Sequence, residues 1–405
     1  MKPDDLTKTA ESYLETLCGV VPNRRMGSRG NQEATDFFAD NIRAYGYEVD
    51  TTPFHCLDYV HGGASLTHDG HIFEDRVNPY SLGCDVLAEL VAVSTVEQLR
   101  DTDCRGKILL MKGPLCVEQL MPKNFGFYNP ERHRRIIALL EASKPAGVVT
   151  ATGRDPEQAG ALSPFPLIND GDFDIPGVFC RDSIGEVLAG MEGDVFRLSI
   201  DARRVPSAAS NVIALRNRNA ARKIVVTAHI DAYEGSPGAV DNASGTAVLL
   251  LLAGMLSDYD GDHGVEIAAF NGEDHYSAGG QMDYLRRYGD KLDTVLLAVN
   301  VDGVGYRKGR SAYSFYGCSA EVEKKGRMVF QALDGVAEGE PWFAGDHMLF
   351  VQAGVPAVAF TSELASELMR TVTHTPLDRP ELIEARQLVE VARTLDVLVR
   401  ALSGS

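Results

Sequence analysis

From about Ser210 onward, short hydrophobic runs alternate with longer segments of helical pattern. Four of these runs are rich in β-branched residues and end in a polar loop, as buried strands do, at residues 221–231, 264–274, 294–305 and 354–362. The segment that begins near Ser244 and the segment Glu381–Leu402 have the apolar spacing of helices. This alternation predicts an α/β fold, with a mixed, mostly parallel sheet flanked by helices on both faces.

The first 206 residues have a different pattern of hydrophobic and turn residues. Helices are predicted over Asp5–Cys18 and Asn31–Tyr45, followed by a short strand at Gly46–Pro53. From Cys56 to Pro206 the chain has turn residues and one helix near Pro130–Ser143, with short β segments at 106–113, 146–153, 175–180 and 194–202. We therefore predict a larger unit of residues 1–55 and 207–405 and a smaller β-rich unit, residues 56–206, inserted into it.

The composition limits the classes of partner. The chain has 405 residues and a net charge of −18, with an isoelectric point near 5.0. Because binding to phosphate relies on clustered Lys and Arg, we expect neither a nucleic acid nor a membrane surface as partner. The apolar stretch around Thr246–Leu256 is predicted to be too short to span a bilayer.

The cysteines and the first residues bear on the cellular location. Seven cysteines are scattered along the chain and none forms a C-x-x-C pair, which is typical of reduced thiols. The N-terminal segment is acidic and lacks the apolar core of a secretory signal. We predict a cytoplasmic protein, and a secreted form without its signal is the alternative.

Carboxylate and imidazole side chains follow the predicted strands, where α/β proteins place their chemistry. They are His229, Asp231, Asp241, Glu273, Asp274, Asp302 and His374. If the strands are parallel neighbours, these side chains emerge at one edge of the sheet, within reach of a common point. Two histidines and three aspartates suffice for two three-ligand zinc sites only if one carboxylate bridges both ions. Asp241, in a loop of small residues, is the natural bridge.

The adjacent acids Glu273 and Asp274 cannot point the same way from extended backbone, so one can bind metal while the other serves as a general base. Asp231, two positions after His229, projects to the same side of the strand. It could therefore accept the ring N–H of His229 and fix its orientation. No G-x-S-x-G elbow, P-loop or G-x-G-x-x-G fingerprint is present, so no motif supports a serine-hydrolase or nucleotide-binding function.

The segment from His229 to Asp378 resembles the co-catalytic di-zinc exopeptidases of metallopeptidase family 28, which include aminopeptidases and glutamate carboxypeptidase II. The matching motifs are AHID, GAVDNASGTA, FNGED, NVDGVG, GDHMLFVQAGVPAVAF and THTPLDRPELI. The resemblance implies a zinc exopeptidase fold of the phosphorylase/hydrolase-like type and a cis peptide at Asp241–Asn242. It assigns His229, Asp241 and Asp302 to one zinc and Asp241, Asp274 and His374 to the other, with Glu273 as base and Asp231 as the partner of His229.

The resemblance extends to the smaller unit and has one departure at the site. Residues Asp85–Asn211 resemble a protease-associated domain, whose family role is to shape substrate access. The family usually has Glu where this chain has Asp274, one methylene shorter. The C-terminal helical dimerisation domain of the glutamate carboxypeptidase II group is not expected, which leaves a homodimer through another surface as an open alternative.

The function predicted is metal-assisted hydrolysis of a peptide or amino-acid amide, first as an aminopeptidase. A carboxypeptidase or N-acyl-amino-acid amidohydrolase is the second hypothesis, weakly favoured by the basic turn with Arg307, Lys308 and Arg310, although a solvated turn is the commoner role. A non-catalytic binding protein of the same fold is a remote third hypothesis. His347 could pack or face substrate, and His133, with its two neighbouring arginines, is expected at the surface.

Overall fold

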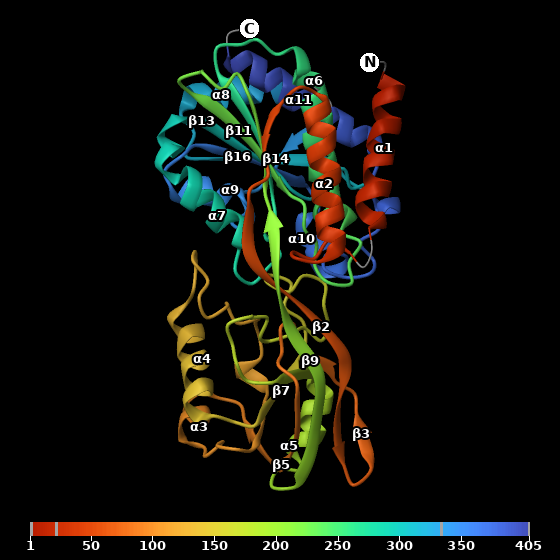
Figure 1. Cartoon of the computed structure of the whole chain (residues 1–405), viewed down its shortest axis with the longest axis vertical. Coiled ribbons are helices and arrows are strands. Elements are labelled where there is room, and N and C mark those ends of the chain that lie inside the picture. The colour runs from red at the N-terminus through yellow and green to blue at the C-terminus, as the bar shows by residue number, and fades with distance from the viewer. Residues whose placement is uncertain (1–2, 21–22, 333–334, 404–405) are drawn as a thin grey trace. The chain divides into compact units, whose positions relative to one another are not determined.

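The computed structural model describes residues 3–20, 23–332 and 335–403, in two compact units (Figure 1). The larger unit consists of the residues up to Cys56, Ala208–Leu368 and the residues from Val372 on. The smaller unit consists of Leu57–Ser207 and Met369–Thr371. The boundaries after Cys56 and after Ser207 lie within two residues of those expected from the sequence, whereas Met369–Thr371 was expected in the larger unit.

The larger unit contains a single eight-stranded sheet with helices around it. Its helices are α1 (Pro3–Gly19), α2 (Arg29–Ala44), α6 (Ser244–Met255), α7 (Gly279–Tyr288), α8 (Ala320–Gln331), α9 (His347–Gln352), α10 (Ala365–Thr371, whose last three residues are grouped with the smaller unit) and α11 (Ala385–Leu402). Its strands are β1 (Glu48–Asp50), β10 (Val212–Arg216), β11 (Lys223–His229), β12 (Gly264–Phe270), β13 (Val295–Val301), β14 (Ser311–Tyr316), β15 (Val336–Glu338) and β16 (Ala357–Ser362).

The strand order is β1-β10-β12-β11-β13-β16-β14-β15. The four central strands, β12, β11, β13 and β16, are parallel, and they are the four strands expected from the hydrophobic runs. Antiparallel pairings join β10 to β12 and β14 to β16, so the sheet is mixed, as predicted. The carboxyl ends of the central strands therefore meet at one edge of the sheet.

Both faces of this sheet are covered. On one face β-strand side chains pack with α1, α2, α6 and α11, and on the other face they pack with α7 and α9. Every residue of β12, and six of the seven in β11, is buried, which explains why these strands are continuous apolar runs. Helix α6 is apolar all round because ten of its residues are buried in the core.

One prediction about the apolar stretches was wrong. The helical segment Ala239–Asp258 has 20 residues and is apolar enough, by length and composition, to cross a membrane. Of the 18-residue window of this segment that is apolar enough, 83% is buried inside the structure, so its hydrophobicity is accounted for by the core of the larger unit.

The smaller unit is built on a second eight-stranded sheet, in the order β3-β2-β9-β5-β6-β7-β8-β4. Its strands are β2 (Pro53–His68), β3 (His71–Phe73), β4 (Arg76–Val77), β5 (Cys84–Val93), β6 (Ile108–Met111), β7 (Gly147–Thr152), β8 (Gly177–Arg181) and β9 (Val195–Ser210). Its helices are α3 (Val96–Asp101), α4 (Glu131–Ser143) and α5 (Asp182–Ala189). Strand β9 is far longer than the segment expected at 194–202, and β2 was not among the segments expected from the sequence.

Candidate metal centre

Strand β11 ends at His229, whose side chain is 1% exposed. Its ring Nδ1 lies 3.2 Å from the main-chain oxygen of Asp231 and 3.6 Å from the Asp231 carboxylate. The main-chain oxygen of Asp231 is therefore the closer partner of the ring, whereas the sequence predicted the carboxylate. This contact leaves Nε2 of His229 directed toward the acidic side chains that follow the other strands.

Asp241 lies between the two histidines. Its Oδ1 is 3.2 Å from Nε2 of His229, and its Oδ2 is 3.2 Å from Nε2 of His374. The two oxygens of one carboxylate thus serve two imidazoles, which is the arrangement that a bridging ligand requires.

The remaining acids complete two groups around Asp241. Asp302, directly after β13, has Oδ1 3.7 Å from Nε2 of His229. Asp274, in the loop after β12, has Oδ1 3.0 Å from Nε2 of His374, so the shorter side chain still reaches its neighbour. The structure therefore brings together all five residues that the sequence proposed as ligands.

These donors fit zinc. Imidazole nitrogen and carboxylate oxygen are the ligands that zinc prefers alongside thiolate. His229, Asp241 and Asp274 each offer a ligand atom, and these atoms lie within 4.8 Å of one another. Nε2 of His229 and Oδ2 of Asp274 are buried without a hydrogen-bond partner among the described residues. Such orphaned atoms are explained by an ion that binds them.

The charges at the site also call for a cation. Burial raises the pKa of Asp274 to about 6, helped by the charge of Asp241. Burial lowers the pKa of His229, but the charge of Asp302 and the neighbouring carboxylates of Asp231 and Asp241 outweigh burial and hold the pKa well above its usual value. A bound cation would offset this repulsion among buried carboxylates and leave the imidazoles neutral for binding.

Glu273 stands beside these residues and has a different environment. Burial raises its pKa well above the usual value, and although the charge of His229 lowers the pKa, the charges of Asp274 and Asp302 raise it further. Its carboxylate makes no hydrogen bond to another described residue. A carboxylate with a raised pKa and a free acceptor is suited to proton transfer.

The carboxylate of Asp231 holds the loop that carries Glu273 and Asp274. Its Oδ1 accepts the main-chain N–H groups of Gly272 at 2.7 Å and Glu273 at 3.3 Å, and its Oδ2 accepts that of Asp274 at 3.1 Å. This function was not predicted from the sequence. Asp231, which follows β11, therefore positions the loop that follows β12.

Asp378 holds the Asp241 loop and was missed as a functional residue, although the sequence analysis included its motif. Its carboxylate accepts the main-chain N–H of Val240 at 2.7 Å and that of Asp241 at 3.1 Å. The Asp241–Asn242 peptide is cis, as the family resemblance implied. Gly238 precedes this loop with φ +62°, and a Cβ there would lie 2.5 Å from the main-chain oxygen of Asp241.

Arg24 is a second residue missed by the sequence analysis. Its side chain is 1% exposed. Its guanidinium donates to the main-chain oxygens of Ile230 at 2.6 Å, Leu17 and Pro237 at 2.8 Å, and Gly238 at 2.7 Å. It thereby ties both ends of the loop between β11 and Asp241 to α1. No role was assigned from the sequence to its segment, RRMGSRG, which leads from α1 into α2.

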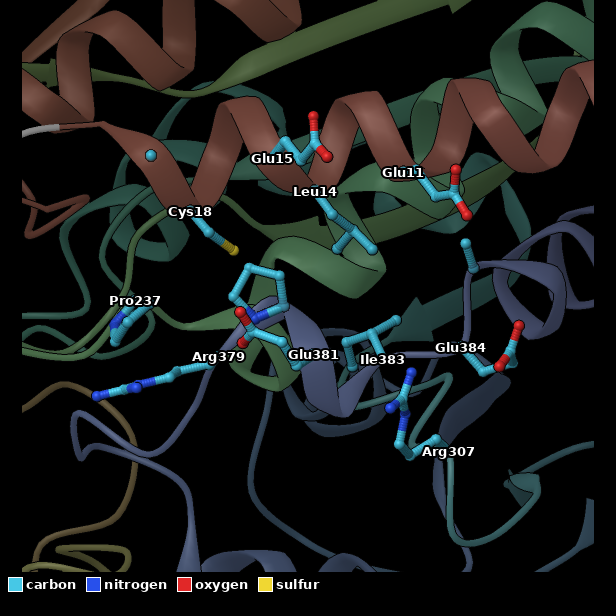
Figure 2. A pocket seen from close by; sticks show the side chains of 13 residues that line it. Glu11, Leu14, Glu15, Cys18, Pro237, Arg307, Arg379, Glu381, Ile383 and Glu384 are labelled. Atoms are coloured by element: carbon cyan, nitrogen blue, oxygen red, sulfur yellow. The ribbon is translucent and has the colours of Figure 1, made fainter.

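The basic turn lies apart from the five candidate ligands. Arg307 lines a cavity of about 710 Å³ between α1 and the segment around Pro380, together with Arg379 (Figure 2). None of the candidate ligands lines this cavity. Arg310 is paired with Glu363 at 3.3 Å. The basic turn therefore no longer favours the carboxypeptidase hypothesis.

Two histidines singled out from the sequence, His347 and His133, lie outside the site and are buried. His347 packs between the rings of Tyr316 and Trp342, and its Nε2 lies 3.0 Å from the main-chain oxygen of Trp342. Packing is therefore its observed role. The expectation that His133 lies at the surface was wrong: it is 4% exposed, and its Nδ1 accepts the main-chain N–H of Met121 at 3.1 Å because it faces inward from α4.

Comparison with known proteins agrees with this geometry. Residues 211–399 match the model of Peptidase family M28. The chain is 26% identical to Aminopeptidase YwaD of Bacillus subtilis (strain 168) over 416 aligned positions, which cover 94% of this chain and 81% of that protein.

Solved structures share the fold over almost the whole chain. An aminopeptidase from Aneurinibacillus sp. strain AM-1 superimposes with a TM-score of 0.74 at 24% identity, covering 98% of this chain and 93% of the other. BSAP, a zinc aminopeptidase from Bacillus subtilis, gives a TM-score of 0.73 at 21% identity, covering 98% and 94%. At these identities the structural likeness establishes the fold.

Proposed function

Since this chain carries a Peptidase family M28 domain and is a metallopeptidase, we propose that it is a zinc aminopeptidase that removes the N-terminal residue of peptides. The observation that carries the proposal is Asp241, whose two oxygens each lie 3.2 Å from a different imidazole. The name of the relative Aminopeptidase YwaD supports the same reaction.

Two zinc ions would be held by the five residues around this carboxylate. His229, Asp241 and Asp302 would bind one ion, and Asp241, Asp274 and His374 would bind the other. Zinc ions bound there would lower the pKa of a water molecule and polarise the scissile carbonyl group. The distances to His229 and His374 support this division, since Asp302 is near the first histidine and Asp274 near the second.

The chain's own residues would move the proton. Glu273 takes a proton from the attacking water, because its carboxylate has a raised pKa and an acceptor that no other described residue occupies. The protonated Glu273 then delivers that proton to the leaving amine. Asp231 keeps Glu273 in place through its main-chain N–H, and Asp378 keeps Asp241 in place in the same way.

The substrate class follows from the proposed reaction and has a direct test. An aminopeptidase hydrolyses aminoacyl anilides that have a free amine and leaves N-blocked dipeptides intact. Turnover of the blocked dipeptides without turnover of any free-amine substrate would reverse the assignment in favour of an amidohydrolase. A zinc content near two per chain with no turnover of either substrate would support the non-catalytic alternative.

Two substitutions test the assigned roles. Glu273→Gln should retain zinc and lose most of its turnover, because the amide has no basic oxygen for the proton. Asp241→Ala should lose metal, because both groups lose a shared ligand. Glu33→Gln, on the surface of α2, is a control that should behave as wild type. A rate near that of wild type in Glu273→Gln would disprove the base assignment, and two zinc ions in Asp241→Ala would disprove the bridge.

Other expectations from the sequence stay predictions. They are the protease-associated character of the smaller unit, the cytoplasmic location and the homodimer.

A further inference from the structure

The cavity between α1 and the segment around Pro380 is used by no step of the proposed reaction. Its volume of about 710 Å³ lies within the range of about 300–1,000 Å³ that is usual for small-molecule sites. Figure 2 shows side chains of α1 on one side of the cavity and the segment that follows Asp378, with Arg307, on the other. Leu14 and Ile383 supply apolar lining, and charged side chains lie around them. The cavity therefore has the size and the mixed lining of a binding site.

The cavity is lined by charges of both signs that do not neutralise one another. The exposed guanidinium group of Arg307 makes no hydrogen bond or ion pair with a described residue. The guanidinium group of Arg379 donates to the main-chain oxygen of Pro376 at 2.8 Å and pairs with no described carboxylate. The acidic side chains that line the cavity, none of which forms an ion pair within the described ranges, are Glu11, Glu15, Glu381 and Glu384. Both signs of charge are thus available to a ligand.

These charges determine the class of ligand. A purely anionic ligand would meet four carboxylates against two guanidinium groups, and a purely cationic ligand would leave both guanidinium groups unpaired. A molecule with one carboxylate and one ammonium group satisfies both kinds of charge, because guanidinium binds carboxylate in a bidentate fork and carboxylates accept hydrogen bonds from ammonium. The volume of the cavity and its apolar lining at Leu14 and Ile383 leave room for side chains between the two charged ends. A short peptide with free ends has this chemistry.

The cavity adjoins the groups that hold Asp241. Pro237 lines the cavity, and its main-chain oxygen accepts a hydrogen bond from Nη1 of Arg24 at 2.8 Å. Arg379 also lines the cavity, and it directly follows Asp378, whose carboxylate accepts the main-chain N–H of Asp241. A ligand in the cavity therefore contacts both segments that support the loop of Asp241. Because a loop that one ligand has already ordered costs less to order for a second, such a ligand favours metal binding.

We propose that this cavity is an effector site for a short peptide with free ends, whose carboxylate binds Arg307 and whose ammonium group faces the glutamates, and that its occupation strengthens zinc binding at the centre. By linkage, zinc strengthens peptide binding by the same factor. The binding of the peptide does not depend on the proposed reaction, because it is measured without hydrolysis, whereas the link to zinc rests on the proposed metal centre.

A charge reversal tests the site. The probe is tetra-alanine with an N-methyl group on its first peptide bond, which hinders hydrolysis, and the same peptide with a C-terminal amide lacks the carboxylate. Calorimetric titration of the zinc-loaded protein measures Kd for both peptides. Arg307→Glu reverses the charge in the cavity. Lys308→Glu is the matched control, because it makes the same change at the next residue of the turn, which does not line the cavity. Both side chains are exposed, so both variants should fold as wild type does.

For wild type and Lys308→Glu we expect the free-acid peptide to bind about 10-fold more tightly than its amide. Arg307→Glu should bind the free acid about 10-fold more weakly than the control does, and it should no longer distinguish the acid from the amide. Zinc titration of the apoprotein with the peptide at saturation should show a gain in zinc affinity of about 5-fold in wild type and in the control. Arg307→Glu should show no such gain.

Equal affinities of wild type for the acid and the amide would overturn the class of ligand. Equal affinities of Arg307→Glu and Lys308→Glu for the acid would overturn the site, and so would the absence of any binding by wild type. A peptide that binds through Arg307 without changing zinc affinity would overturn the link to the centre. In each of these cases, hydrolysis of aminoacyl anilides by wild type would leave the proposed function intact.

Discussion

The Oδ2 atom of Asp231 accepts the main-chain N–H of Asp274 at 3.1 Å, so a residue after β11 fixes a candidate ligand after β12. The other carboxylate oxygen binds the two preceding amides of the same loop, at Gly272 and Glu273. A single buried carboxylate therefore holds both the proposed base and a proposed ligand. The site should be sensitive to any substitution of Asp231 that removes one of its two acceptor oxygens.

Asp231→Asn should impair both zinc binding and turnover. The amide group offers one acceptor oxygen where the loop needs two, and residues that orient metal ligands typically cost about 10- to 100-fold in metal affinity or activity when changed. Zinc affinity and kcat/KM measured side by side would check this. Asp40→Asn, an exposed change on α2, is the control, and an unaltered rate in Asp231→Asn would contradict the role.

Asp378→Asn should weaken zinc binding while the fold remains. Its carboxylate binds the amides of Val240 and Asp241, and the loss of one acceptor oxygen lets the bridging side chain turn away from its position. We expect zinc affinity to fall about 10- to 100-fold, and zinc titration of the apoprotein measures it. Circular dichroism should match wild type. Tight binding of zinc in this variant would show that the loop that carries Asp241 keeps its position without the Asp378 carboxylate.

Arg24→Met should destabilise the larger unit. The change leaves three buried main-chain oxygens and one partly buried one without their donor, and we expect the free energy of unfolding to fall by about 3 kcal/mol. Denaturant titration measures this value. The matched control is Arg29→Met, because that side chain is 85% exposed and its loss should change the stability by less than about 0.5 kcal/mol.

Removal of metal should lower the thermal stability. A ligand that binds only the folded state stabilises it by about 2.7 kcal/mol at a concentration 100 times its Kd. Treatment with a chelator should therefore lower Tm, and added zinc should restore it. Asp241→Ala should show little response to zinc in the same assay. A chelator-independent Tm in wild type would argue against a resident ion.

Asp50 should give the larger unit a pH-dependent increment of stability. Although burial raises its pKa, hydrogen bonds from Tyr288 and Thr52 and the charge of Arg287 outweigh burial and lower the pKa from 3.8 to about 2. The contribution is present above the unfolded pKa and is lost as pH falls through the folded one. Asp50→Asn should cost below about 1 kcal/mol at pH 7, and nothing near pH 2. Unfolding measured across this range checks the sign.

Much of the site was predictable because it depends on local pattern. Each central strand is buried on both faces, so it reads as a continuous apolar run, and the first polar residues after it mark the edge of the sheet. His229, Asp274 and Asp302 were found in this way. Strand β14 was not predicted, since its serines interrupt the apolar pattern and it pairs antiparallel with β16 near the border of the sheet.

The sequence by itself determined the central strands, the division into two units and the candidate ligands. These features depend on the hydrophobic pattern and on the residue types of neighbouring positions, which can be recognised locally. Only the tertiary structure decided which partner each polar group has. Arg24 reaches oxygens more than two hundred residues away, and Asp378 reaches amides 137 and 138 positions earlier. Tyr233 meets His374 through the same long-range folding. Such contacts depend on how the strand ends converge in space, and no local pattern encodes them.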